Sequence, residues 1–162
     1  MRARLPFLLI ALDSDNDSAF INANLLPYCE EKKLTFTRCR PYKKNDQVHV
    51  EQKNWTVVRQ LIGYDRYESA EACELLGAIY VDWWLLVNLF QPVRKLLEKQ
   101  RLGRKVHKRY DVAKTPYQRV LASSDVSEEK KEKLREVYRM LNPVALRRRI
   151  SENFKKLWRL RG

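Results

Sequence analysis

One stretch of sequence decides the fold: Leu5-Pro6-Phe7-Leu8-Leu9-Ile10-Ala11-Leu12-Asp13-Ser14-Asp15-Asn16-Asp17-Ser18-Ala19-Phe20. It begins as a short apolar run and ends in acidic and small polar residues. An apolar run of this length, followed by turn-forming residues, is typical of a buried strand that ends in a loop. We therefore expect a strand over residues 5–13, with Asp15 just beyond its end.

A second carboxylate, Glu51, follows Asp15 after 35 intervening residues. Asn45 and Asp46 favour a helix start, so the sequence predicts a helix from there to about residue 62, ended by Gly63. Three apolar residues follow Glu51 at i+4, i+7 and i+11 on one helical stripe: Trp55, Val58 and Ile62. A carboxylate on an apolar face is unfavourable unless it is paired or metal-bound. A metal-ligand role for Glu51 therefore competes with an ion pair to Lys or Arg.

The chain between the two carboxylates predicts a helix, a strand and a basic loop. Residues 20–31 have helical spacing after a plausible N-cap at Ser18, although the interior Pro27 weakens this prediction. Residues 34–39 alternate apolar and polar side chains, as a strand does. Residues 40–44 are a basic loop containing Pro41.

These residues, in this order, resemble the second half of the catalytic domain of DDE transposases and retroviral-type integrases. In that family a strand ends in Asp-Asn-Gly-Ser-Glu-Phe, a helix and a short strand follow, and a later helix carries the catalytic Glu. The matching segments are Asp15-Asn16, Phe20-Ile21-Asn22, Arg40-Pro41-Tyr42-Lys43-Lys44-Asn45, Val50-Glu51-Gln52, Asn88-Leu89-Phe90-Gln91-Pro92 and Lys114-Thr115-Pro116-Tyr117-Gln118-Arg119. Asp17 and Ala19 stand where the family has Gly and Glu.

The resemblance implies that Asp15 and Glu51 are the second and third members of a catalytic acidic triad. In the family this triad holds Mg²⁺ or Mn²⁺ ions for DNA strand transfer. The first Asp lies on an earlier strand of the family's domain, and no residue here matches it. Asp13 shares a strand face with Asp15 and is a makeshift third ligand or, by default, a surface carboxylate.

The resemblance thus implies an α/β protein organised in two parts. Residues 1–66 are expected to form a partial RNase H-like (integrase core) fold with few strands, and residues 67–162 a mostly helical, basic extension. The chain looks like an N-terminally truncated transposase copy from an insertion sequence, expected to be inactive by itself. The alternative is a non-catalytic, DNA-binding or multimerising remnant that modulates a full-length transposase.

The charge distribution points to a nucleic-acid partner. The formal net charge is +13, and residues 91–119 and 143–162 carry most of the excess of Lys and Arg. DNA, as element ends and target, is the expected partner, beside a homo-oligomer or a hetero-oligomer with full-length transposase. A ribosomal or RNA-binding protein is suggested by charge alone. The predicted DNA contacts are Arg40, Lys43, Lys44, Lys53, Arg104, Lys105, Lys108, Arg109, Arg147, Arg148 and Arg149.

The second half of the chain predicts three helices and one irregular segment. A long helix is expected over 68–101, capped by Ser69 and kinked or broken by Pro92. Its Trp83 and Trp84 suit a core role better than a base-stacking platform. Residues 101–119 are expected to be irregular, and Tyr110 and Tyr117 among their cations suit phosphate contact with occasional base stacking, the alternative being a solvated loop. Two further helices are expected over 127–141 and 144–160, the first solvent-facing with Glu/Lys pairs and the second amphipathic and basic.

The remaining features exclude several classes of protein. Three cysteines and two histidines at wide spacing do not form a zinc pattern, so buried or half-buried reduced thiols are expected. The apolar run near residue 5 lacks a cleavage site, which argues against a signal peptide. We expect no membrane span and a cytoplasmic location, associated with the nucleoid if the source is bacterial.

Overall fold

The computed structural model describes residues 5–14, 24–39 and 54–161. It is a mixed α/β structure, and its internal contacts divide the chain into two units, 1–65 and 66–162. Each unit is considered by itself. The expectation that residues 1–66 and 67–162 are separate domains stays a prediction.

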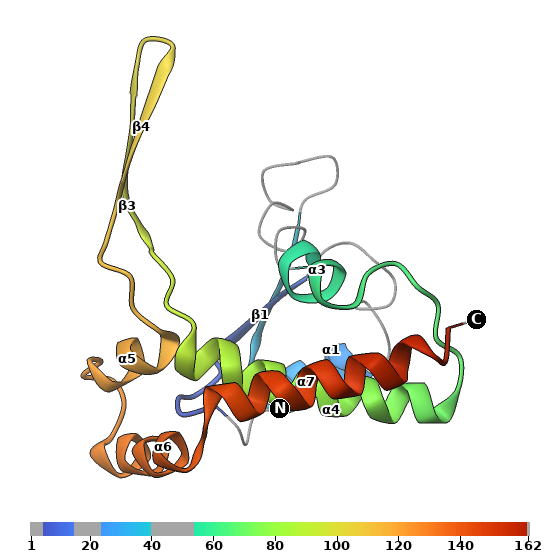
Figure 1. The fold of residues 1–162 in the computed structure, drawn as a ribbon. Coiled ribbons are helices and arrows are strands. Elements are labelled where there is room, and N and C mark those ends of the chain that lie inside the picture. The colour runs from blue at the N-terminus through green and yellow to red at the C-terminus, as the bar shows by residue number, and fades with distance from the viewer. Residues whose placement is uncertain (1–4, 15–23, 40–53, 162) are drawn as a thin grey trace. The chain divides into compact units, whose positions relative to one another are not determined.

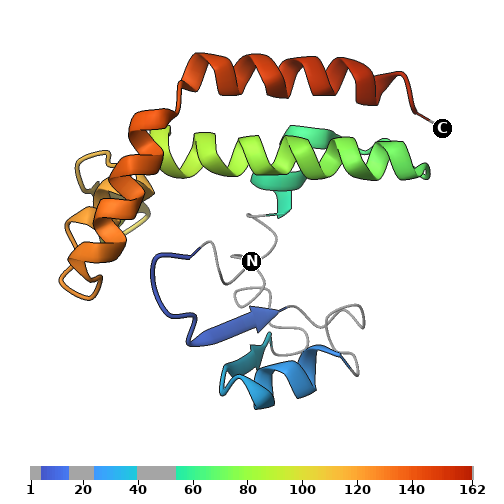
Figure 2. The same ribbon diagram turned by 90° about the horizontal axis from the view of Figure 1, so that it is seen from below.

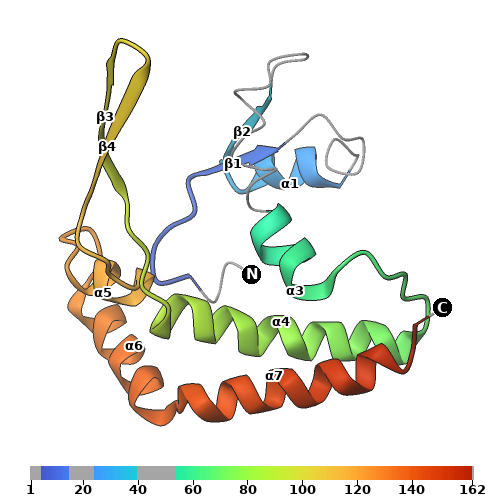
Figure 3. The same cartoon turned by 45° about the horizontal axis from the view of Figure 1, so that its top comes forward.

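The N-terminal unit contains a parallel strand–helix–strand motif (Figure 3). Strand β1 (Ala11–Ser14) pairs in parallel with β2 (Thr35–Arg38), and helix α1 (Leu25–Glu31) connects them. Asp13 lies opposite Thr37 in this register. The order strand, helix, strand agrees with the sequence-based expectation for this segment.

The first strand is shorter and more exposed than the sequence predicted. β1 covers only four residues, and Leu8 and Ile10 before it are each 71% exposed. The prediction of a buried strand from residue 5 was therefore wrong. The only strand paired with β1 among the described residues is the four-residue β2. Such a short sheet leaves apolar side chains uncovered.

Helix α1 explains why Pro27 is tolerated. The helix begins at Leu25, so Pro27 lies in its first turn, where the backbone N–H has no partner within the helix. Residues 20–23 of the expected helix lie outside the described residues.

The end of the predicted helix after Glu51 has an unexpected geometry. A π-helix, η2 (Asn54–Arg59), leads into α3 (Gln60–Ile62), and Gly63 ends it with a positive φ of 83°. Because a π-helix bonds i to i+5, the predicted 3.6-residue stripe does not continue through it. Trp55 of that stripe is in fact exposed.

Two long antiparallel helices form the body of the C-terminal unit, α4 (Ala70–Phe90) and α7 (Pro143–Trp158) (Figures 1 and 2). Both begin within two residues of the predicted starts. Ser69 caps α4 by accepting a hydrogen bond from the Ala72 N–H, and Asn142 caps α7, which has Pro143 at its first position. The buried residues of the two helices recur at spacings of three, four and seven: Ala72, Ile79, Asp82, Leu86, Leu89, Leu146, Ile150 and Leu157. Trp83 and Trp84 are half-buried beside them.

One ion pair lies within this helix pair. Arg149 donates to both carboxylate oxygens of Asp82, at 3.0 Å from Nε and 2.7 Å from Nη2. The Asp82 side chain is only 12% exposed, whereas that of Arg149 is 52% exposed. This bidentate contact satisfies the one acidic residue of α4 that is buried.

By length and composition α4 also meets the requirement for a membrane span, contrary to the sequence-based expectation that no such stretch exists. Its most apolar 18-residue window has a mean hydropathy of 1.4. Any such window includes Asp82, and α7 covers that position with a cation. Only 17% of that window is buried in the structure, so burial does not identify α4 as a core helix, and the absence of a membrane partner stays a prediction.

The long helix ends earlier than predicted, and a β-hairpin follows it. α4 stops at Phe90 rather than at residue 101, and Pro92 lies just beyond it. Antiparallel strands β3 (Leu96–Leu102) and β4 (Lys105–Tyr110) then form an extended ribbon (Figure 1). The expectation of a helix over 91–101 and of an irregular segment over 101–110 was wrong.

Two short helices connect the hairpin to α7. α5 (Pro116–Leu121) has a complete capping box, in which Thr115 and Gln118 exchange hydrogen bonds of 3.1 and 2.8 Å. α6 (Glu128–Met140) begins after Ser127, although the Ser127 side chain does not cap it. Sequence analysis missed α5 and correctly predicted α6.

The cysteines agree in part with the expected thiols. All three are thiols and not disulfides, and Cys29 and Cys39 are buried as predicted. Cys73, in contrast, is exposed on α4.

Candidate nucleic-acid interface

The predicted metal ligands Asp15 and Glu51 lie outside the described residues, as do four predicted DNA contacts, Arg40, Lys43, Lys44 and Lys53. Within residues 5–14, 24–39 and 54–161, no group of three His, Cys, Asp or Glu side chains is placed to hold a metal ion. The structure therefore places only the strand that leads to Asp15.

Asp13 has a partner within the sheet. Its Oδ1 accepts a hydrogen bond of 2.8 Å from the Thr37 hydroxyl on the neighbouring strand. This hydrogen bond forms part of the β1–β2 pairing, and it gives no indication that Asp13 is a metal ligand.

Four other predicted DNA contacts lie on the hairpin. Its strands run in register from Glu98 opposite Arg109 to Leu102 opposite Lys105, and every residue from 96 to 110 is exposed. The turn is Gly103-Arg104, where the φ of +60° at Gly103 suits the first central position of a type II′ turn. The four residues are Arg104, Lys105, Lys108 and Arg109.

The two faces of the hairpin differ in charge. Side chains two residues apart on a strand share a face, and residues opposite each other do so too. One face, which we call the basic face, holds Lys99, Arg101, Val106 and Lys108. The other, the mixed face, holds Glu98, Gln100, Leu102, Lys105, His107 and Arg109. On the mixed face Glu98 accepts a hydrogen bond from Gln100 and pairs with Arg109 at 3.4 Å, so Arg109 is partly neutralised.

The cations of the basic face have no such partners. Lys99 lies directly opposite Lys108, with Arg101 next along the strand. In the part of the chain that the structure describes, neither lysine forms an ion pair, and Arg101 donates only to the Gly103 carbonyl at 3.3 Å. Arg104 and Lys105 at the tip likewise have no acidic partner among the described residues.

The base of the hairpin is fixed to α5. Arg119 donates to Asp111 at 2.7 Å and to the Val93 carbonyl at 2.9 Å, and Asp111 also accepts from the Lys95 N–H at 2.6 Å. The Arg119 hydrogen bond is the main cause that holds the pKa of Asp111 below its ordinary value. These bonds hold together the two chain segments that lead into and out of the ribbon.

An aromatic stack lies beside the hairpin base. The Tyr138 ring stacks on Phe90 at a centroid distance of 5.0 Å and on Tyr117 at 4.7 Å. Tyr117, which the sequence suggested as a base-stacking residue, thus packs between helices. Tyr110 is exposed at the end of β4.

The three arginines predicted on the last helix have different surroundings. Arg149 is committed to Asp82, and Arg148 pairs with Glu152 at 3.0 Å on the same helix. Arg147 is exposed and has no ion pair within the described residues. Only Arg147 of the three keeps its charge fully available to a phosphate.

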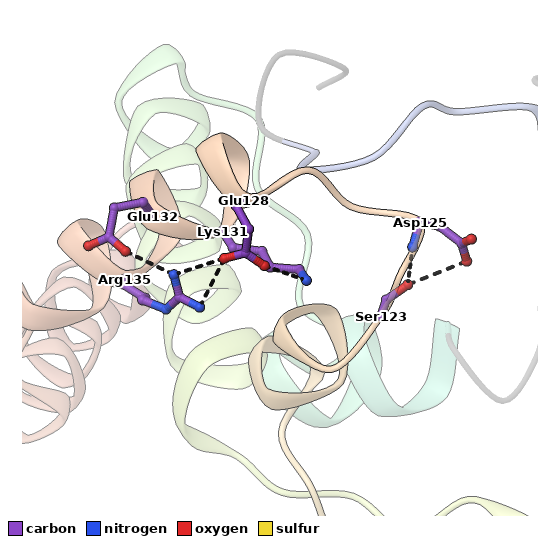
Figure 4. A network of polar contacts seen from close by, with 6 residues as sticks. All are labelled: Ser123, Asp125, Glu128, Lys131, Glu132 and Arg135. Atoms are coloured by element: carbon purple, nitrogen blue, oxygen red, sulfur yellow. Dashed lines mark hydrogen bonds and ion pairs between the residues drawn. The ribbon is translucent and has the colours of Figure 1, made fainter.

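Helix α6 is charged too, but its charges are paired (Figure 4). Lys131 is buried and bonds Glu128 at 2.9 Å, Arg135 bonds Glu132 at 2.8 Å, and Lys133 bonds Glu129 at 2.6 Å. These contacts agree with the expected solvent-facing helix of Glu/Lys pairs.

Sequence analysis missed Lys99 and Arg101 as candidate contacts. It assigned residue 99 to a helix, and it did not select Arg101 as a DNA contact. The alternation on both sides of Leu102-Gly103-Arg104-Lys105 was the available signal, since a glycine turn between alternating runs is typical of a hairpin.

Comparison with known proteins gives one relative by sequence. The uncharacterized protein y4rM of Sinorhizobium fredii (strain NBRC 101917 / NGR234) is 50% identical to the chain over 109 residues. The match covers 67% of this chain but only 31% of the relative, so the chain spans about a third of that protein's length. No protein-family model matches the chain, and no solved structure matches it.

Proposed function

We propose that the chain carries the second half of an integrase-type (RNase H-like) catalytic core that transfers DNA strands. The observation that carries this proposal is the parallel β1–α1–β2 motif, whose first strand ends at Ser14, directly before Asp15. The resemblance requires a helix and a short strand after the strand that leads to Asp15, and α1 and β2 follow β1 in that order. The greater length of the S. fredii relative supports it, since this kind of sequence occurs there within a longer chain.

In this proposal Asp15 and Glu51 hold divalent metal ions. Both donors are carboxylate oxygens, which suit Mg²⁺ or Mn²⁺. The bound ions would activate the attacking hydroxyl or water and stabilise the leaving oxygen of the phosphodiester. The resemblance matches only two of the family's three carboxylates to this sequence, so we expect no strand transfer from these 162 residues alone.

Metal binding tests the proposal without requiring activity. We expect Mn²⁺ titration of the chain, followed by electron paramagnetic resonance, to show binding that Asp15→Asn and Glu51→Gln each weaken at least 10-fold. Asp13→Asn is the matched control, because Asp13 is two residues away and already bonded to Thr37. Equal Mn²⁺ binding by all four proteins would refute the ligand assignment.

A second candidate is a DNA-binding or multimer-forming protein without catalysis. The exposed hairpin favours it, with six cations and one acid over residues 96–110. Salt-sensitive DNA binding in the presence of a chelator, with no nicking when Mn²⁺ is added and no Mn²⁺ binding, would favour this candidate over the first.

A further inference from the structure

The basic face of the hairpin carries a charge arrangement that the hairpin itself does not explain. Lys99 and Lys108 are directly opposite each other, and like charges at this position oppose strand pairing. A two-stranded ribbon with no buried residue is marginal in water in any case. The anchor at Arg119 and Asp111 stabilises the base, but it lies beyond the strand residues that carry the repulsion.

The charges are also segregated in a way that a purely solvated hairpin does not need. The single acid, Glu98, lies on the mixed face with Arg109. The basic face presents three cations without an acid, Lys99, Arg101 and Lys108, and Arg104 adds a fourth at the tip. A partner with closely spaced negative charges would remove the repulsion and match this surface.

We propose that the β3–β4 hairpin is a ribbon that enters the major groove of duplex DNA, with its basic face against the phosphates and its tip towards the base edges. The strands of a ribbon lie about 4.8 Å apart, and the major groove is about 12 Å wide and about 8.5 Å deep, so a two-stranded ribbon with side chains fits it. Seven residues of β3 span roughly 23 Å, which is longer than the groove is deep. The tip can therefore reach the groove floor while the base stays on α5.

This inference deepens the proposed function, because DNA is the substrate there, but it can fail separately from it. Binding by the hairpin needs neither Asp15 nor Glu51 and no metal ion. Measurements in a chelator therefore test the hairpin alone, whereas the Mn²⁺ titration tests the carboxylates alone.

The experiment compares two triple variants of the chain with equal loss of charge. The first neutralises the basic face by Lys99→Gln, Arg101→Gln and Lys108→Gln. The control neutralises three exposed cations of α6 by Lys130→Gln, Lys133→Gln and Arg139→Gln. Affinity for a 20-base-pair duplex is measured in a chelator by fluorescence anisotropy at several salt concentrations, after circular dichroism has shown that both variants are folded.

We expect the basic-face variant alone to lose the salt dependence that phosphate contacts produce. Each contact contributes about 0.9 to the slope of log affinity against log salt, so three contacts correspond to roughly 2.7. The unmodified chain should then lose about 40-fold more affinity than the variant between 50 and 200 mM salt. The α6 control should follow the unmodified chain.

A second duplex distinguishes contacts in the major groove from contacts with the phosphate backbone. In this duplex the cytosines carry glucosylated 5-hydroxymethyl groups. These groups fill the major groove, and the phosphates are unchanged. We expect this duplex to weaken binding of the unmodified chain at least 10-fold and to change binding of the basic-face variant little.

Three results would overturn the proposal. One is an equal salt slope for the two triple variants, which would show that the change in salt dependence comes from net charge and not from the basic face. Another is unaltered binding to the glucosylated duplex, which would leave only backbone contact. The third is equal affinity for single-stranded DNA, RNA or polyglutamate, since none of these offers the groove of duplex DNA.

Discussion

The β3–β4 hairpin and helix α6 are both exposed and highly charged, yet their charges are arranged in opposite ways. α6 holds five cations and four acids, and ion pairs at i+3 and i+4 join them along the helix. The hairpin holds six cations and one acid, and its basic face places Lys99 opposite Lys108. The mixed charges of α6 are thus paired within the helix, whereas the cations on the basic face of the hairpin have no acid on that face.

The largest expected effect concerns the helix body to which both regions are attached. Leu157 is fully buried in α7, so Leu157→Ala should lower the free energy of unfolding by about 2–5 kcal/mol. Urea unfolding measures this loss. Met140→Ala at the end of α6, where the side chain is 87% exposed, should change it by less than about 0.5 kcal/mol. Equal effects of the two substitutions would contradict the α4–α7 body as the source of stability.

An intermediate effect is expected from one substitution made in both regions. Lys108→Glu replaces the repulsion with Lys99 by an opposite-charge pair, and should stabilise the hairpin by about 0.2–1 kcal/mol. Lys133→Glu in α6 breaks the pair with Glu129 and sets two acids at i and i+4, so it should lower the helix content. Amide hydrogen exchange of β3, β4 and α6 measures both changes.

The proposed difference between the hairpin and α6 would be contradicted if Lys108→Glu and Lys133→Glu changed the amide hydrogen exchange of their elements in the same direction. It would be sharpened if Lys108→Glu protected the hairpin amides and also weakened DNA binding. That result would show that the repulsive pair is kept for binding at the expense of stability.

The smallest expected effect is a pH dependence that differs between the regions. Glu128, Glu129 and Glu132 of α6 have lowered pKa values, caused first by hydrogen bonds from Lys131, Lys133 and Arg135 respectively. A lowered folded-state pKa gives stability that is present above the unfolded value, about 4.3 for Glu, and is lost as pH falls through the folded value. The Tm should therefore fall as the pH is lowered below about 4.

At the base of the hairpin the pKa of Asp111 is lowered too, first by the hydrogen bond from Arg119. Replacing the three α6 glutamates by Gln should flatten most of the acid-induced fall in Tm, and Asp111→Asn should flatten a smaller part. A larger change for Asp111→Asn would contradict the view that α6 contains most of the pH-sensitive pairs within the described part of the chain.

The sequence predicted elements whose signals are local. Ser69 and Asn142-Pro143 mark the starts of α4 and α7, and Gly63 ends α3, because capping and glycine conformation depend on a few neighbouring residues. The parallel β1–α1–β2 motif was also expected in outline. The Thr115-Pro116 start of α5 carries an equally local signal, a capping box with proline at the first position, and it was overlooked.

Elements that depend on distant partners were not predicted. The segment Leu96-Leu97-Glu98-Lys99-Gln100 contains good helix formers, and only its pairing with β4 makes it a strand. Arg149 was predicted to contact DNA because it is one of three consecutive arginines. Its bond to Asp82 joins residues 67 positions apart, which no local pattern reveals. For the metal site, the sequence resemblance still provides the assignment, because Asp15 and Glu51 lie outside the described residues.

The contact between Arg149 and Asp82 also fixes how α4 and α7 are aligned along their length. The apolar residues of the two helices repeat at intervals of three, four and seven, so a slide by one turn would bring similar side chains together again. Such a slide moves one helix about 5.4 Å past the other, which is farther than the 2.7 Å bond can follow. The slipped arrangement would leave a nearly buried carboxylate without its cation. The Arg149–Asp82 pair therefore selects one alignment of α4 and α7 from several that would pack their apolar residues comparably.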